Sequence, residues 1–160
     1  MRHLFVPLAL VALAGCGFRP MYAPLPDGSG PIGAISVAPI DGKAGFVLQT
    51  ELARLLTVTT GPGTPRLLEV ELTESVVRLG YRIDESAQRA DLIVRANYTL
   101  APATESEEAL TGSLSTTVSY DIPLSAYGEI AAQDDARERA GENLARMLRV
   151  ELAQRLAAQR

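Results

Sequence analysis

Residues 110–122 carry the strictest pattern in the chain, an alternation of apolar and polar side chains along LTGSLSTTVSYDI. Successive side chains of a β-strand point to opposite faces, so the pattern predicts a strand with one buried and one solvated face. Its apolar side consists of Leu110, Leu114, Val118, Tyr120 and Ile122. Its polar side consists of Thr111, Ser113, Ser115, Thr117 and Ser119. Such a strand belongs to an antiparallel sheet that is covered on one side only.

Three further segments predict strands. Residues 91–100 alternate without interruption. Residues 66–79 alternate at first, but the adjacent pair Val76-Val77 makes the apolar side ambiguous, which predicts a β-bulge near Ser75. Residues 34–40 are short and rich in β-branched side chains, and they complete a four-stranded sheet.

Two segments have the period of amphipathic helices. Residues 44–58 place four leucines on one face, namely Leu48, Leu52, Leu55 and Leu56. A second, long helix is predicted from about Glu129 to Ala158. Its expected buried stripe is Ala140, Leu144, Met147, Leu148, Leu152 and Leu156. We expect Gly141 inside this helix to mark a close approach to the sheet, because glycine otherwise weakens a helix by about 1 kcal/mol.

The predicted element order is therefore β-α-β-β-β-α. It favours an α+β two-layer sandwich, in which two helices cover one face of a four-stranded, mostly antiparallel sheet. A chain of 160 residues has room for one such domain, which we assign to residues 34–160. The content of 47% hydrophobic and 21% charged residues is typical of a globular protein.

Residues 1–15 have the pattern of a cleaved bacterial signal peptide. Arg2 supplies a positive charge, and the apolar run 4–13 is shorter than the about 20 residues that a membrane-spanning helix needs. The run ends in Leu13-Ala14-Gly15-Cys16, the pattern of a lipoprotein cleavage site. We expect Cys16, the only cysteine, to become the new N-terminus and to carry the lipid. The alternative is an ordinary signal peptide followed by a chance cysteine.

Residues 16–33 are predicted to form an extended tether behind the lipidated cysteine. Four prolines in this stretch lack the N–H group that helices and sheet interiors use, namely Pro20, Pro24, Pro26 and Pro31. Gly17 stands where an aspartate retains lipoproteins in the inner membrane of enteric bacteria. The glycine at this position therefore favours an anchor in the outer membrane, with the domain on the periplasmic face.

Groups that carry catalysis or bind metals are scarce. His3 is the only histidine and lies in the expected signal peptide, while lipidation consumes Cys16. We therefore expect a protein that is not an enzyme and that has no cofactor and no metal ion. The acidic clusters at 105–108 and 134–135 are interpreted as solvated surface, and a carboxylate-dependent envelope hydrolase stays open as an alternative. The net charge of −4 and the absence of a Lys/Arg run argue against a nucleic-acid partner.

The segment Cys16-Gly17-Phe18-Arg19-Pro20-Met21-Tyr22 resembles CGFRPLY, the start of the lipopolysaccharide-assembly lipoprotein LptE family in its alphaproteobacterial form. Met21 stands where leucine is usual. The C-terminal run from Ser119-Tyr120 through AQDDARERAGENLARMLRVELAQRL also resembles that family, with a tyrosine-containing strand before an Ala/Arg/Glu-rich helix. The resemblance implies an outer-membrane lipoprotein that plugs the LptD β-barrel, supports its assembly and binds lipopolysaccharide. An auxiliary lipoprotein of an ABC-type envelope lipid transporter would share these features and remains an alternative.

Two sets of residues are candidates for contacts. Four arginines are the only basic residues between Leu67 and Leu100, and their guanidinium groups suit lipid A phosphates. They are Arg78, Arg82, Arg89 and Arg95. The polar side of the third long strand is uncharged and therefore less costly to desolvate than a charged face, so it suits a protein partner. Its candidate interface residues are Ser113, Ser115, Thr117 and Ser119. Ordinary solvation is the alternative for both sets.

Overall fold

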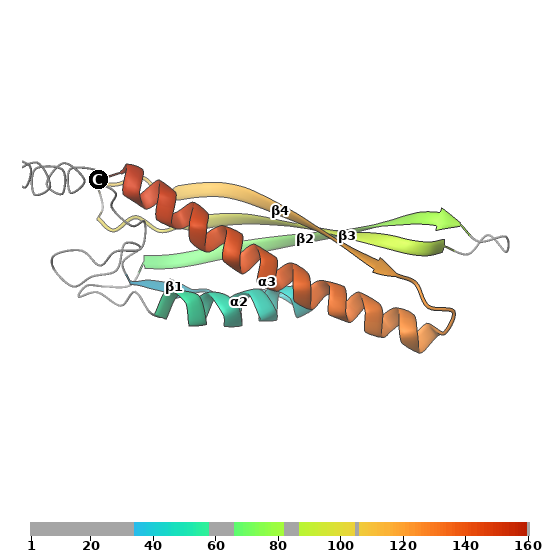
Figure 1. The fold of residues 1–160 in the computed structure, drawn as a ribbon. Helices are drawn as coiled ribbons and strands as arrows, with labels where there is room; N and C mark the ends of the chain where they lie inside the picture. Colours follow the sequence, from blue (N-terminus) through green and yellow to red (C-terminus); the bar gives the residue numbers. More distant parts are fainter. Residues whose placement is uncertain (1–33, 58–65, 82–86, 105, 160) are drawn as a thin grey trace, which may run out of the picture.

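The computed structural model describes residues 34–57, 66–81, 87–104 and 106–159 (Figure 1). Along these ranges the elements are β1 (Ile35–Val37), α2 (Gly42–Thr57), β2 (Arg66–Tyr81), β3 (Ala87–Leu100), β4 (Leu110–Asp121) and α3 (Ala126–Ala158). The predicted α+β class and the order β-α-β-β-β-α are confirmed. The expected signal peptide at 1–15 and the tether at 16–33 lie outside the described residues.

The sheet has the strand order β1-β2-β3-β4, with β1 parallel to β2 and the other neighbours antiparallel. The predicted bulge near Ser75 is wrong, because the register runs on without a break through Glu74↔Val94, Ser75↔Ile93 and Val76↔Leu92. The second valine, Val77, lies on the solvated face of β2 and is 43% exposed. An apolar residue is tolerated there, so the run of two valines does not require the strand to change its pairing.

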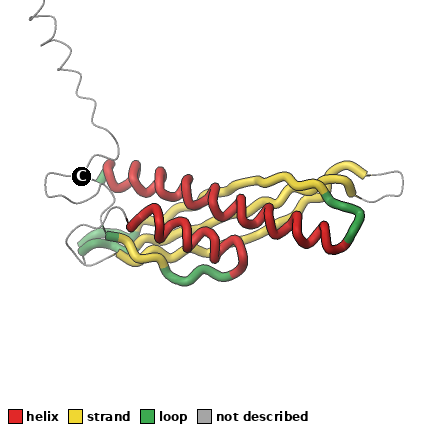
Figure 2. Tube along the Cα trace, turned by 60° about the horizontal axis from the view of Figure 1, so that its bottom comes forward, coloured by secondary structure: helices red, strands yellow, loops and turns green. Residues whose placement is uncertain are grey.

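Both helices lie side by side over the same face of the sheet (Figure 2). The core between the two layers is built from buried leucines of both helices and from the inward side chains of β3. Its largest fully buried members are Tyr98, Leu48, Leu52, Leu68, Leu92, Leu100, Leu144, Leu148, Leu152 and Val94. The alternation predicted for residues 91–100 and 110–122 is therefore confirmed, with one face covered by helices and the other left open.

The two helices approach each other closely at Gly141. A Cβ atom at this position would lie 2.8 Å from the carbonyl oxygen of Ala44 and 3.1 Å from the amide nitrogen of Leu48. The predicted close approach exists, but its partner is α2 and not the sheet. Glycine is required here because two helix backbones pack against each other without an intervening side chain.

Two details of the helices differ from expectation. Met147, expected in the buried stripe, is 39% exposed, because it lies about 100° around α3 from Leu148, at the flank of that stripe. Helix α3 also begins at Ala126, before the predicted Glu129. Ser125 caps this start, since its side-chain oxygen accepts a hydrogen bond of 3.1 Å from the Gly128 amide. The first strand is shorter than predicted and covers Ile35–Val37 only.

Candidate functional site

The open face of the sheet contains the predicted partner-interface residues. Ser113, Ser115, Thr117 and Ser119 all lie exposed on the face of β4 that points away from both helices. Their cross-strand neighbours on β3 are polar or partly exposed as well, namely Asn97, Arg95, Ile93 and Asp91. The four hydroxyl residues therefore form one continuous row, as the alternation predicts.

Side-chain contacts fix one end of this row. The Ser119 hydroxyl donates a hydrogen bond of 2.6 Å to Asp91 Oδ1 on the neighbouring strand. Two strand positions away, Arg89 Nε lies 3.4 Å from Asp121 Oδ1. Both contacts are exposed to solvent, so they contribute little to stability and can exchange for contacts with a partner.

The four candidate lipopolysaccharide contacts do not form a single cluster among the described residues. Arg89 and Arg95 lie on the open face, about 20 Å apart along β3 at roughly 3.3 Å per residue. Arg78 lies on the opposite, helix-facing side of β2, where its Nη2 is 3.0 Å from Glu129 Oε1 of α3. Arg82 falls outside the described residues.

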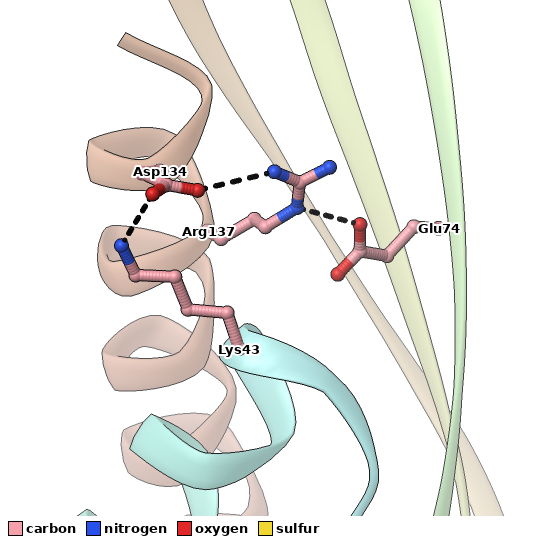
Figure 3. A network of polar contacts seen from close by, with 4 residues as sticks. All are labelled: Lys43, Glu74, Asp134 and Arg137. Atoms are coloured by element: carbon pink, nitrogen blue, oxygen red, sulfur yellow. Dashed lines mark hydrogen bonds and ion pairs between the residues drawn. The ribbon is translucent and has the colours of Figure 1, made fainter. Parts of the chain in front are cut away.

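A network of ion pairs joins three elements beside the core (Figure 3). Asp134 of α3 accepts from Lys43 Nζ of α2 at 2.8 Å and lies 3.3 Å from Arg137 Nη1. Arg137 reaches across to β2, where its Nε is 3.0 Å from Glu74 Oε2. The hydrogen bond from Lys43 lowers the pKa of the Asp134 carboxyl, against a smaller opposing effect of burial. The hydrogen bond to Glu74 likewise raises the pKa of Arg137.

The network makes stability depend on pH in a defined direction. A carboxyl with a lowered pKa stabilises the fold above its ordinary value of about 3.8, and that contribution is lost as the pH falls through the lowered value. We expect Asp134→Asn to lower the melting temperature at pH 7, and the gap to the wild-type protein to close below about pH 3.8. Asp135→Asn is the matched control, since Asp135 pairs only with Arg139 of its own helix in the described contacts. Equal losses in the two variants, measured by thermal unfolding at several pH values, would contradict this role.

An open groove runs between the outer edge of β4 and α3, and the sequence did not reveal it. Its volume is about 470 Å³, and it is lined by Thr117, Val118, Ser119, Arg139, Glu142, Asn143 and Arg146. Arg146 Nη1 lies 3.8 Å from Glu142 Oε2, and Arg139 Nη2 lies 2.9 Å from Asp135 Oδ2. The spacing of Glu142 and Arg146 signals a helix pair, but only the packing of α3 beside the last strand brings these residues to the edge of the sheet.

Neither a metal cluster nor a membrane-spanning helix is found in the described parts of the chain. In those ranges, His, Cys, Asp and Glu side chains form no group of three or more that could hold a metal ion. Of the helices described, none combines the length and the apolar character needed to cross a membrane.

The fold is shared with solved structures of bacterial lipoproteins. A Caulobacter crescentus protein described as a candidate lipoprotein is 28% identical, with a TM-score of 0.58 over 77% of this chain and 90% of that one. Rare lipoprotein B from Shewanella oneidensis is 13% identical, with a TM-score of 0.54 over 80% and 98%. A minor lipoprotein from Acinetobacter baumannii is 15% identical, with a TM-score of 0.52 over 76% and 93%.

These similar structures are lipoproteins by description. The likeness is consistent with an envelope lipoprotein, and each match covers nine tenths or more of the other chain's length. At 13% and 15% identity, the second and third matches show only that the fold is shared. No family model matches the sequence. No curated protein matches it either.

Proposed function

We propose that this chain is an outer-membrane lipoprotein, anchored through Cys16 on the periplasmic face, that plugs an LptD-type β-barrel and supports its assembly for lipopolysaccharide transport. The observation that carries the proposal is a combination of two features. The segment Cys16–Tyr22 resembles the start of the LptE family. The domain that follows has a fold similar to those of several lipoproteins, rare lipoprotein B among them.

The shape and surface of the domain support a plug. Helix α3 has 33 residues and is therefore about 50 Å long at 1.5 Å per residue, so the domain is elongated (Figure 1). The lumen of a large outer-membrane barrel is polar. An open sheet face that presents the hydroxyls of Ser113, Ser115, Thr117 and Ser119 suits such a wall, because hydroxyl groups are less costly to desolvate than ions.

The test is recovery of the barrel partner. The full-length lipoprotein, tagged at its C-terminus, is extracted in mild detergent from the total membranes of its native host and its partners are identified by mass spectrometry. We expect stoichiometric recovery of an LptD-type barrel protein. Recovery of an inner-membrane ATPase complex in its place would favour the auxiliary lipoprotein of an ABC-type transporter, and recovery of neither would refute both assignments.

Lipopolysaccharide binding is expected to depend on the candidate arginines. Replacing Arg78, Arg82, Arg89 and Arg95 by Gln should weaken binding about tenfold, the equivalent of about 1.4 kcal/mol. The loss should shrink as salt is raised, because the contacts to phosphate are screened. Arg78 faces the helices and pairs with Glu129 at 3.0 Å, whereas Arg89 pairs with Asp121 at 3.4 Å on the open face, so the pair Arg89→Gln and Arg95→Gln should account for most of the effect.

Binding of purified lipopolysaccharide to the folded variants measures this dependence. Arg54→Gln is the control, because Arg54 is exposed on α2 and pairs with Glu51 of the same helix. If the fourfold variant binds as tightly as the control at low salt, the assignment of these arginines is wrong.

A further inference from the structure

The outer edge of β4 is the sheet edge with the fewest features that prevent strand pairing. An edge strand presents unpaired N–H and C=O groups, and natural proteins protect such edges with charges, prolines or bulges. From Leu110 to Tyr120, β4 has no charged residue and no proline, and its pairing with β3 is continuous. By contrast, the part of β2 that extends beyond the short β1 carries Glu74 and Arg78, which are tied to α3 by ion pairs.

The register determines which backbone groups of β4 face outward. The Ala101 amide donates to the Leu67 carbonyl at 2.8 Å, so the odd-numbered residues of β3 turn their backbone groups toward β2. Backbone groups alternate in direction along a strand, and Leu100 pairs with Leu110. The even-numbered residues of β4 therefore bond to β3, and the odd-numbered residues turn their N–H and C=O groups to the free edge.

One contact agrees with this direction. Arg155 Nη1 of α3 donates a hydrogen bond of 3.2 Å to the carbonyl oxygen of Thr111, which it could not reach if that oxygen pointed at β3. Arg155 is held in place by Glu151, whose Oε1 lies 2.7 Å from its Nε. Beyond Thr111, no backbone group in the described ranges pairs with the outward groups of Ser113, Ser115, Thr117 and Ser119.

We propose that an extended polypeptide segment of the barrel partner adds as a fifth strand to the free edge of β4, between Ser113 and Ser119. This inference rests on the proposed function and specifies how the partner binds. A closed barrel has no free strand edge of its own, so the added segment belongs to a loop or a terminus of the partner rather than to its wall.

The groove beside the edge specifies the chemistry of the added strand. Its side chains would alternate between the open face and the groove, where Arg139 and Arg146 lie on the α3 side with Glu142 between them. Arg139 pairs with Asp135 at 2.9 Å and Arg146 with Glu142 at 3.8 Å, so what the groove offers a ligand is the remaining guanidinium N–H donors of the two arginines. Acidic side chains at alternate positions of the segment fit the groove, and small polar side chains fit the hydroxyl row.

Two other occupants fit the same edge less well. In a symmetric pair of copies joined through β4, the same patch meets itself, so Arg139 and Arg146 would approach their own equivalents. The tether at 16–33 carries four prolines and can offer only an interrupted series of N–H donors. The two arginines of the groove and the continuity of the edge favour a separate, acidic segment.

Amide hydrogen exchange on the native complex tests the proposal directly. In the isolated lipoprotein, the amides of Ser113, Ser115, Thr117 and Ser119 should exchange at least about tenfold faster than those of the even-numbered residues of β4. In the complex with the barrel, the same four amides should become protected. If these amides exchange equally fast in both states, strand addition by the partner is overturned. If they are already protected in the isolated lipoprotein, the edge is occupied by a second copy or by the tether, which also overturns the proposal.

Proline substitution separates the edge from the open face. Ser115→Pro removes an outward N–H group and should reduce recovery of the barrel about tenfold, whereas Ser115→Ala removes only the hydroxyl of the open face and should reduce recovery much less. Equal losses in the two variants would assign the contact to the open face instead. Failure of the wild-type protein to recover the barrel would refute the proposed function itself, while undiminished recovery by a folded Ser115→Pro variant would overturn the strand addition alone.

Discussion

Replacing Cys16 by serine should leave an unprocessed precursor that takes up no labelled palmitate. The hydroxyl of serine cannot take the place of the thiol to which the diacylglyceryl group is attached. Each buried methylene of an acyl chain contributes about 0.8 kcal/mol to membrane binding, so the precursor loses this anchor and keeps only the uncleaved apolar run 4–13. The expected change is all-or-none, and it is measured by the size of the protein and its labelling.

The control keeps the cysteine and changes its neighbour. Gly17→Ala should still mature and label, because residue 16 is intact and the side chain added at position 17 is small. A Cys16→Ser variant that matures to the shorter form and incorporates palmitate would show that the anchor lies elsewhere in the chain.

Gly141→Val should destabilise the domain more than a valine at any exposed position of α3. A Cβ atom at residue 141 would lie 2.8 Å from the backbone oxygen of Ala44 and 3.0 Å from Val47 Cβ. Neither neighbour is the end of a flexible side chain, so α2 and α3 must move apart and the leucine core between them must loosen. Overpacking of this kind costs about 3 kcal/mol, which for a domain of this size lowers the melting temperature by roughly 10 °C.

Ala131→Val is the matched control for that substitution. Ala131 is exposed on the same helix, so the valine there adds only the weak helix preference of a β-branched residue, about 0.5 kcal/mol. Thermal or urea unfolding of both variants gives the comparison. A Gly141→Val protein as stable as the Ala131→Val protein would mean that the helix contact is not close-packed.

Much of the fold follows from the spacing of apolar side chains. The strict alternation in β3 and β4 predicts one covered face, and the leucine spacing in α2 predicts its buried side, because both patterns come from local geometry. The prediction of a bulge near Ser75 is wrong for a physical reason. Spacing alone cannot distinguish an apolar residue that turns inward from one that stays on the solvated face, as Val77 does.

The candidate site is only partly accessible to the same reasoning. The hydroxyl row is a property of one strand, so its residues can be named from the sequence. The free edge of β4 and the groove beside it depend on strand order and on the path of α3 across the sheet. Strand order is set by long-range packing, and periodicity within a segment carries no information about it.

Helix α3 changes the way it is attached to the sheet along its length. From Ala136 to Leu156 it is held by buried apolar residues, whereas residues 126–135 include no buried side chain and are tied down by charged groups. Cooling weakens the first kind of attachment, and dissolved salt weakens the second. Helix α3 thus has a firmly attached C-terminal part and a more loosely attached N-terminal part, and ionic strength alone can loosen residues 126–135 without unfolding the rest.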